Sequence, residues 1–229
     1  MIKVCGKNVL TDLDELVAPS HTALIVIDMQ FDFIDPRGLF GQLGVDLSMY
    51  DESRPRLRQL LEAARDHGVL VIHLQNTQLA NHMIDSPAQH RFNLRMHGGF
   101  RQGDQPLTYT VPGTPGHEFL PEFQPLAHEL VVRKYRSSGF WGTNLPMLLR
   151  SNQIETVVMT GCTTEGCVES TARDAMFNDF YVVIAEDCVA SDDRSQHDAS
   201  LHLMRHRFDL ATGAQIQNVW EASAPAGEE

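Results

Sequence analysis

The sequence of 229 residues lacks any apolar run long enough to form a signal core or to span a membrane. It also lacks internal repeats, low-complexity blocks and any shift in composition that would mark a domain boundary. We therefore expect a cytoplasmic protein with one domain over residues 1–221, followed by a small, acidic, disordered tail over residues 222–229.

Positive charge is in short supply, because 18 Lys and Arg residues stand against 30 Asp and Glu residues, giving a formal net charge of −12. A nucleic-acid groove and a surface for anionic membranes both require the opposite balance. The charge therefore argues against nucleic acid and membrane as partners, and it mainly predicts good solubility.

Cysteine is scarce too, with four residues: Cys5, Cys162, Cys167 and Cys188. Their spacing matches no paired zinc motif, and no further Cys or His falls at metal-ligand spacing from Cys162 and Cys167. A reducing compartment argues against structural disulfides. We expect no metal and no cofactor.

What the sequence does contain is an alternation of short apolar runs and amphipathic segments. Residues 23–27 are almost wholly apolar, as expected for a strand buried on both faces of a parallel sheet. The alternation predicts an α/β fold, with three αβα layers around a mostly parallel, roughly six-stranded, doubly wound sheet. The expected strands are residues 23–27, 69–74, 129–133, 156–159, 181–185 and 209–212, and the expected helices are residues 52–67, 145–152, 167–178, 194–206 and one from residue 214.

Residues 76–127 interrupt this alternation with a long segment rich in Gly, Pro and His. Such segments inside compact domains usually serve as a lid, a binding loop or a subunit contact. Because this one follows directly on a predicted strand, we expect its first part to overhang the carboxyl end of the sheet.

Three residues with complementary chemistry follow predicted strands: Asp28, Lys134 and Cys167. Ligands of open α/β sheets bind at the carboxyl ends of the strands, so the fold would bring the three together. Residues 160–168 place Cys167 where a strand passes into a helix, and backbone N–H groups and the helix dipole favour a thiolate there. A nucleophilic thiolate, an ammonium that stabilises it and a carboxylate that accepts and returns its proton suit acyl transfer.

Each of the three residues also has a purely structural explanation. A buried cysteine often serves as a small hydrophobic residue, Asp28 could cap a strand end, and Lys134 could be a solvated charge. Their joint placement at three strand ends favours the catalytic interpretation.

Three segments carry a resemblance to a known family: residues 23–33 (ALIVIDMQFDF), Lys134 with residues 138–143 (SGFWGT), and residues 160–175, which contain GCTTEGCVESTARDA. Over roughly residues 22–219 the sequence resembles the isochorismatase-like cysteine hydrolases. These include N-carbamoylsarcosine amidase, ureidoacrylate amidohydrolase and the biuret and triuret hydrolases.

The resemblance implies a catalytic triad of Asp28, Lys134 and Cys167. It also implies a cis peptide between Cys162 and Thr163, and an oxyanion hole formed by the backbone N–H groups of Thr163 and Cys167. Relatives commonly form homo-oligomers, either dimers or tetramers, in which a lid can receive residues from a neighbouring subunit.

Metal dependence varies within the family, since some nicotinamidases bind a metal through an Asp-x-His pair and a further His. Residues 32–44 contain no His, so the resemblance to this metal-binding class is weak here. We expect a metal-independent enzyme, although histidines occur elsewhere at positions that include His73, His82, His90, His97 and His117.

The resemblance implies hydrolysis of a C–N bond in a small carbamoyl or ureido compound of the biuret, triuret, N-carbamoyl amino acid or ureidoacrylate type, through a thioester and with release of ammonia. Such a planar group suits aromatic walls and polar partners, although aromatic candidates can instead pack in the core. Glu165, where relatives commonly carry Asn or Ser, would disfavour an anionic substrate, whereas Arg136 would favour one. The candidates for substrate binding are Phe33, Tyr135, Arg136, Phe140, Trp141, Glu165 and Gln215.

Three alternatives stay open. The substrate could be a simple amide such as maleamate. The protein could be a thiol redox protein using Cys162 and Cys167, although their spacing does not ensure disulfide geometry. A non-catalytic interaction protein is the third alternative, but it would be expected to lack a triad residue, and none is missing.

Overall fold

The computed structural model describes residues 1–96 and 107–223. Its centre is a six-stranded sheet in which all strands run parallel, in the order β5-β4-β3-β6-β7-β8. This confirms the predicted α/β fold with a doubly wound sheet. The strands are β3 (Thr22–Ile27), β4 (Leu70–Asn76), β5 (Leu130–Lys134), β6 (Thr156–Cys162), β7 (Tyr181–Ala190) and β8 (Asp209–Ala211).

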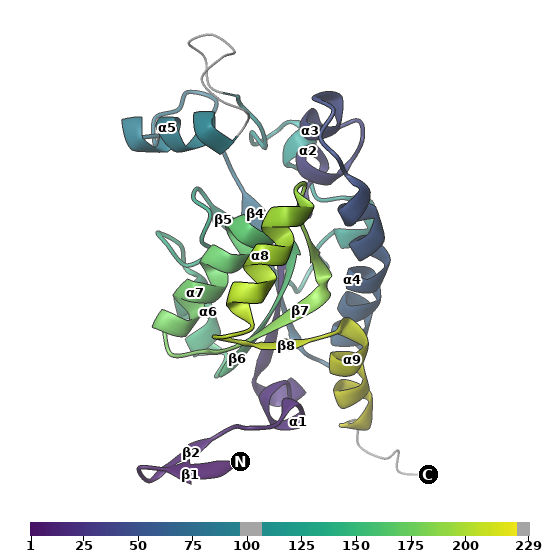
Figure 1. Ribbon diagram of the computed structural model, residues 1–229, viewed down its shortest axis with the longest axis vertical. Coiled ribbons are helices and arrows are strands. Elements are labelled where there is room, and N and C mark those ends of the chain that lie inside the picture. Colours follow the sequence, from purple (N-terminus) through teal and green to yellow (C-terminus); the bar gives the residue numbers. More distant parts are fainter. Residues whose placement is uncertain (97–106, 224–229) are drawn as a thin grey trace.

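Helices cover both faces of the sheet (Figure 1), and the central strand β3 explains why. All six of its residues are buried, and alternate side chains enter two different apolar clusters. Leu24 and Val26 belong to the cluster that contains residues of α4 and α9, whereas Ile25 and Ile27 belong to the cluster that contains residues of α6, α7 and α8. The covering helices are α4 (Ser48–Asp66), α6 (Leu145–Ser151), α7 (Glu169–Phe177), α8 (Arg194–Met204) and α9 (Gly213–Ala222).

Two strands extend three or more residues beyond their predicted ends. β6 continues to Cys162 and β7 to Ala190, because the two strands pair again beyond an irregularity that follows Met159. The expected helix from residue 167 instead begins with a separate turn, η4 (Thr164–Val168), and α7 starts only at Glu169. Both differences concern the backbone that leads to Cys167 and surrounds it.

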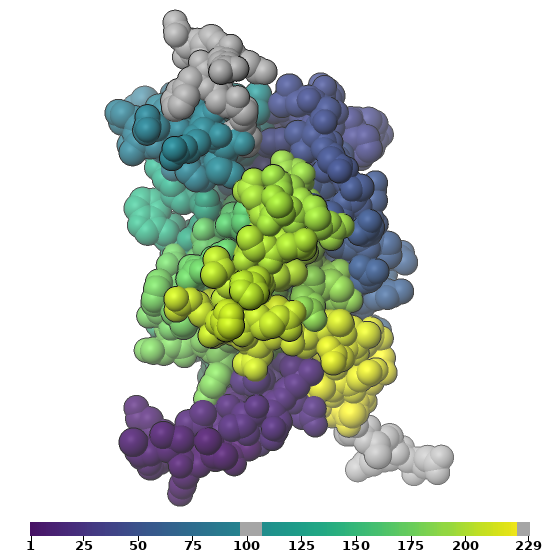
Figure 2. All heavy atoms as spheres, in the orientation of Figure 1, coloured from purple at the N-terminus to yellow at the C-terminus, as the bar shows by residue number. Residues whose placement is uncertain are grey.

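The long segment after β4 contains its own helix, α5 (Pro87–Met96), and two short turns, η2 (Pro115–His117) and η3 (Pro121–Phe123). Two further short helices, α2 (Phe31–Ile34) and α3 (Leu39–Gln42), follow β3. Figure 2 shows α5 and this α2–α3 region at one end of the molecule. His97 of the predicted lid lies outside the described residues.

The opposite end carries an N-terminal hairpin, β1 (Ile2–Val4) with β2 (Lys7–Val9), which the sequence analysis did not predict (Figures 1 and 2). A short helix, α1 (Leu13–Leu16), and the turn η1 (Pro19–His21) connect the hairpin to β3. The predicted tail lies outside the described residues from residue 224 onward. Among the helices that are described, none combines the length and the apolar character needed to cross a membrane.

Candidate active site

The candidate site lies at the carboxyl ends of β3, β5 and β6. Asp28 follows β3, Lys134 is the last residue of β5, and Cys167 lies five residues after β6 ends. β3 pairs with β4 on one side and with β6 on the other, so the chain switches direction across the sheet at this point. A crevice at such a switch point is the usual ligand site of an open α/β sheet.

Lys134 joins the other two residues through its ammonium group. Its Nζ lies 2.7 Å from Asp28 Oδ2 as an ion pair, and it donates to Cys167 Sγ at 3.1 Å. Asp28 also accepts a hydrogen bond from the backbone N–H of Asn76, at 2.9 Å. Lys134 is fully buried, so the alternative of a solvated surface charge was wrong. The fold brings the three predicted triad residues together.

Burial dominates the ionisation of these groups. It raises the pKa of Cys167 to about 12, although the charge of Lys134 acts in the opposite direction. Burial also raises the pKa of Asp28, against the lowering effect of Lys134. For Lys134 itself burial would lower the pKa, but Asp28 and Cys167 together raise it. The raised pKa of Cys167 favours a thiol beside the Lys134 ammonium, whereas the strand-to-helix position alone would favour a thiolate.

Cys167 sits in a turn with hydrogen bonds of the π-helical type. The carbonyl of Thr163 accepts hydrogen bonds from the N–H groups of Gly166 and Val168, both at 3.1 Å, and Thr171 Oγ1 donates to the carbonyl of Cys167 at 2.6 Å. The peptide between Cys162 and Thr163 is cis, as the family resemblance implied. Thr163 and Cys167 both line the adjoining cavity, and their role as oxyanion donors stays a prediction.

A cavity of about 360 Å³ adjoins the triad and has an aromatic wall. Phe33, which the sequence predicted, stacks on Phe40 at 5.3 Å between ring centroids and meets Tyr109 edge-on at 5.5 Å. The predicted Tyr135 also lines the cavity. Amide side chains add hydrogen-bonding groups to the lining: Asn76, Gln78, Gln89, Asn93 and Gln196. This size and composition suit a small, polar, planar ligand.

The charged residues of the described lining are mostly acidic: Asp28, Asp85, Glu165, Asp192 and Asp193, with Arg136 as the cation. Glu165 Oε2 is buried and has no hydrogen-bond partner among the described residues. Burial raises the pKa of Glu165, with hydrogen bonding to Ser191 acting against it.

Arg136, in contrast, is already engaged by the protein. It donates from Nη1 to the carbonyl of Tyr135 at 2.6 Å and from Nη2 to the carbonyl of Ile84 at 2.7 Å. Its Nη1 also lies 3.8 Å from Asp85 Oδ1, and its guanidinium stands over the ring of Trp141. Of the two candidate specificity residues, Glu165 therefore has the polar atom, Oε2, that is available to form a hydrogen bond with a ligand.

Three of the predicted binding residues do not line this cavity, so their assignment to substrate binding was wrong. Phe140 is buried in the core beside Phe180, with ring centroids 6.0 Å apart. Trp141 points outward and is 64% exposed, so its cavity contact is only the indirect one through Arg136. Gln215 caps helix α9, where its side chain accepts a hydrogen bond from the N–H of Thr212.

Sequence reasoning missed several lining residues, among them Phe40 and Tyr109. Both lie in segments whose sequences show no helical or strand periodicity. The only signal for them in the sequence was therefore an aromatic side chain with no assigned structural role. Gln89 and Asn93 were missed because α5 was read as part of an irregular loop. Their spacing of four residues was the available signal, since it places both on one face of a helix.

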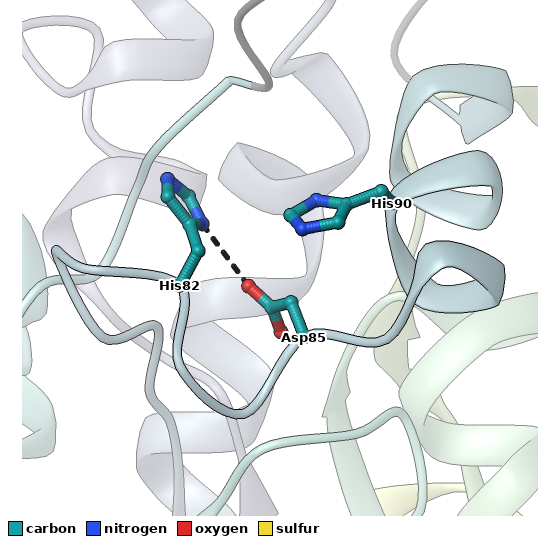
Figure 3. Close-up of side chains that lie close together, drawn as sticks. All are labelled: His82, Asp85 and His90. Carbon is teal, nitrogen blue, oxygen red and sulfur yellow. Dashed lines mark hydrogen bonds and ion pairs between the residues drawn. The ribbon is translucent and has the colours of Figure 1, made fainter.

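Three side chains of the segment after β4 could hold a metal ion: His82, Asp85 and His90, whose candidate ligand atoms all lie within 4.8 Å of one another (Figure 3). The other histidines named from the sequence have different neighbours. His73 lies beside Glu129, and His117 lies beside Thr77. Neither Cys162 nor Cys167 belongs to a group of three candidate ligands in the described part of the chain.

Comparison with known proteins agrees with this geometry. The family model of the isochorismatase domain matches residues 22–216. Ureidoacrylate amidohydrolase RutB of Acinetobacter baylyi is 30% identical over 205 residues, which cover 87% of this chain and 83% of that protein. The enzyme of the same name from Enterobacter sp. (strain 638) is 34% identical over 174 residues, covering 74% and 75% of the two chains.

Solved structures show the same relationship. N-carbamoylsarcosine amidase from Thermoplasma acidophilum is 27% identical, with a TM-score of 0.63 and coverage of 84% of this chain and 96% of that one. A cysteine hydrolase from Pseudomonas syringae pv. phaseolicola 1448A shares the fold, with a TM-score of 0.75 at 23% identity and coverage of 91% and 96%. The chain therefore belongs to the isochorismatase family and is a hydrolase of that fold.

Proposed function

We propose that this protein is a cysteine amidohydrolase that cleaves a C–N bond of a small carbamoyl or ureido compound through a thioester. The observation that carries the proposal is the position of Lys134 Nζ, 2.7 Å from Asp28 Oδ2 and 3.1 Å from Cys167 Sγ, beside a cavity of small-molecule size. The names of the relatives support an amide or ureido C–N bond as the target.

In the first step Asp28 accepts the proton of Cys167 while the sulfur attacks the carbonyl carbon. The pKa of Cys167 is raised to about 12, so a free thiolate is rare at neutral pH and proton transfer accompanies the attack. The raised pKa of Asp28 makes its carboxylate a stronger base than an ordinary aspartate. Lys134 stabilises the negative charge that develops on sulfur.

The tetrahedral oxyanion then accepts hydrogen bonds from the N–H groups of Thr163 and Cys167, each worth about 2.7–4 kcal/mol of barrier lowering. Asp28 returns its proton to the departing nitrogen, the C–N bond breaks, and ammonia leaves behind a thioester on Cys167. Water adds to the thioester carbonyl and releases the acid, which restores the thiol.

The preferred substrate of this reaction is a neutral compound rich in N–H groups, such as biuret or triuret. In its ionised form, Glu165 can accept a hydrogen bond from such a ligand at its buried Oε2, whereas it would repel a carboxylate. Arg136 offers weaker compensation, because one N–H of each terminal nitrogen already donates to a backbone carbonyl and Asp85 Oδ1 lies 3.8 Å from Nη1. In this respect the protein would differ from relatives named for ureidoacrylate, which is an anion.

Hydrolysis of a simple amide such as maleamate is the alternative enzymatic function. Maleamate, like ureidoacrylate, is an anion, so Glu165 would disfavour it as well. The thiol redox alternative has less support, because Cys162 is buried and its thiol donates to the carbonyl of Asp28 at 3.3 Å. Hydrolysis that persists under strong reductant would separate the enzyme from a redox protein. A non-catalytic interaction protein would leave the assembled triad without a purpose.

Ammonia release from a substrate panel tests the proposal. We expect kcat/KM for biuret or triuret to exceed that for ureidoacrylate, N-carbamoylsarcosine and maleamate. Glu165→Gln should reduce the ratio of kcat/KM for neutral over anionic substrates by at least about tenfold, since one charge about 4 Å away in a partly buried site is worth up to about 4 kcal/mol. Glu155→Gln removes an exposed carboxylate that precedes β6 and should leave the preference unchanged.

Two results would count against the proposal in different ways. If anionic substrates are turned over faster than neutral ones, and Glu165→Gln does not change this ratio, the proposed preference for neutral substrates is wrong. The proposed hydrolase activity is not contradicted by that result. Absence of ammonia release from every carbamoyl, ureido and amide compound in the panel would contradict the proposed function itself.

A further inference from the structure

The lid brings together two imidazoles and a carboxylate that lie within nine residues of one another in the sequence. His82 Nδ1 lies 3.0 Å from Asp85 Oδ2, and the rings of His82 and His90 are 5.6 Å apart between centroids. Figure 3 shows the ring of His90 pointing from α5 toward the gap between His82 and Asp85. The three candidate ligand atoms face one common space.

This cluster is partly buried, with the side chain of His82 23% exposed, and it is incompletely hydrogen-bonded. The side chain of Asp85 is only 7% exposed. The Nδ1 atom of His90 is buried and has no hydrogen-bond partner among the described residues. A buried polar atom left without a partner costs about 1–3 kcal/mol, so a bound cation would relieve an existing deficit.

We propose that His82, Asp85 and His90 bind a divalent transition-metal ion such as Zn²⁺. Two imidazole nitrogens and one carboxylate oxygen form a ligand set that such ions prefer, at about 2.0–2.2 Å from the metal, with a fourth position for water. The observed 3.0 Å between His82 Nδ1 and Asp85 Oδ2 is close to the roughly 3.3 Å expected between two ligands of one tetrahedral ion. His90 has to approach by a rotation of its side chain.

The surroundings of the cluster resemble an outer coordination shell. His82 Nε2 lies 3.3 Å from Thr108 Oγ1, so a proton on Nε2 would leave Nδ1 free to bind the metal. Asp85 Oδ1 lies 3.8 Å from Nη1 of Arg136, which helps to orient the carboxylate. Such outer contacts fix the tautomer and direction of metal ligands.

The ion would fasten the loop after β4 to helix α5. These two segments supply Gln78, Asp85, Gln89 and Asn93 to the cavity lining, so a bound metal would hold the lid in position over the substrate. No step of the cysteine chemistry passes through it. The sequence analysis expected no metal because residues 32–44 contain no His and no ligand falls at metal spacing from Cys162 and Cys167, so it did not consider this cluster.

Titration of the full-length protein with Co²⁺ tests the site without any substrate. We expect one equivalent to bind and to produce the visible absorption of a tetrahedral complex. His82→Ala and His90→Ala should each weaken binding by at least the roughly 10–100-fold that loss of an outer-shell partner causes. His202→Ala is the matched control, since His202 and His206 form an exposed ring pair at 5.3 Å, and it should change nothing.

Circular dichroism would confirm that each variant is folded, and Zn²⁺ should raise the Tm of the unaltered protein but not of His90→Ala. Absence of binding, or binding that survives in both His82→Ala and His90→Ala, would overturn the proposal. The effect on catalysis rests on the proposed function: metal removal should raise KM and leave kcat nearly unchanged. The Co²⁺ spectrum decides the site even if no substrate is hydrolysed.

Discussion

At the scale of single residues, the burial of Lys134 has the largest consequence. Its ammonium is completely removed from water and lies between a carboxylate and a thiol. A buried charge is stable only with close partners, so the arrangement holds Asp28 and Cys167 at a fixed separation. We therefore predict that the proposed chemistry of Cys167 depends on Lys134.

The raised pKa of Cys167, about 12, has a measurable consequence for alkylation. The rate of iodoacetamide reaction at Cys167 should still rise with pH beyond about pH 10, where the rate for an ordinary thiol has nearly levelled off. Lys134→Met removes the charge that lowers this pKa, so alkylation should become slower still and activity should fall by roughly 10²–10⁴-fold.

Peptide mass spectrometry would follow Cys167 separately, with the exposed Cys5 as an internal reference in the same sample. A plateau in the rate at Cys167 below about pH 10 would contradict the account. So would faster alkylation in Lys134→Met.

At the scale of elements, the sequence located the strands but not the ends that build the site. Strands buried on both faces are nearly continuous apolar runs, which is why residues 23–27 and 156–159 were recognised. The turn that carries Cys167 depends on the pairing of β6 with β7 beyond Met159. It also depends on two backbone N–H groups that both donate to the carbonyl of Thr163. Neither arrangement has a periodic pattern.

Gly161 shows how strictly β6 is constrained at this end. Its φ is 98°, and a Cβ at this position would collide with the backbone of Ile27. We expect Gly161→Ala to lower the free energy of unfolding by about 3 kcal/mol or more, because backbone strain and a steric clash add.

Gly142→Ala provides the matched control for that loss. Gly142 also has a positive φ, of 68°, but a Cβ there would have no neighbour within 4 Å. Strain alone should cost about 1–2 kcal/mol in chemical denaturation. Equal losses for the two variants would show that the contact with β3 is unimportant.

At the scale of the whole molecule, the rule that ligands bind at the carboxyl ends of strands was sufficient to group Asp28, Lys134 and Cys167. It did not give side-chain direction, so Phe140 and Trp141 were assigned to a cavity that neither lines. Nor could it place Tyr109 beside Phe33, because that contact depends on the path of the lid across the sheet.

A second buried ionic group connects distant elements below the site. Glu129 has a side chain that is 2% exposed, and it lies 2.7 Å from Nε of Arg65 on α4 and 2.9 Å from Nε2 of His73 on β4. Burial would raise the pKa of Glu129, but hydrogen bonds from Arg65, Leu126 and His73 lower it to about 2. The group therefore links β4, β5 and α4 only while Glu129 is ionised.

Glu129→Gln should lower the free energy of unfolding by about 1–3 kcal/mol at neutral pH, because it leaves Arg65, whose side chain is only 20% exposed, without its countercharge. The folded-state pKa lies below the usual 4.5, so this stabilisation is complete above about pH 4.5 and is lost as the pH falls toward 2. Chemical denaturation across that pH range should show that the free energy of unfolding falls less steeply with decreasing pH in the variant than in the unaltered protein.

Glu62→Gln serves as the surface control for this prediction. Glu62 is 56% exposed and lies 3.9 Å from Arg58, so its removal should change stability by no more than about 0.5 kcal/mol. Similar effects of the two substitutions would contradict the structural importance assigned to Glu129.

The most direct test of the central claim is covalent trapping at Cys167. Acid-quenched protein, mixed with a carbamoyl or ureido substrate that it hydrolyses, should carry the acyl group of that substrate as added mass on the peptide containing Cys167. Cys167→Ala should fold normally, acquire no added mass and release no ammonia. Ammonia release by Cys167→Ala at the rate of the unaltered protein would contradict the account.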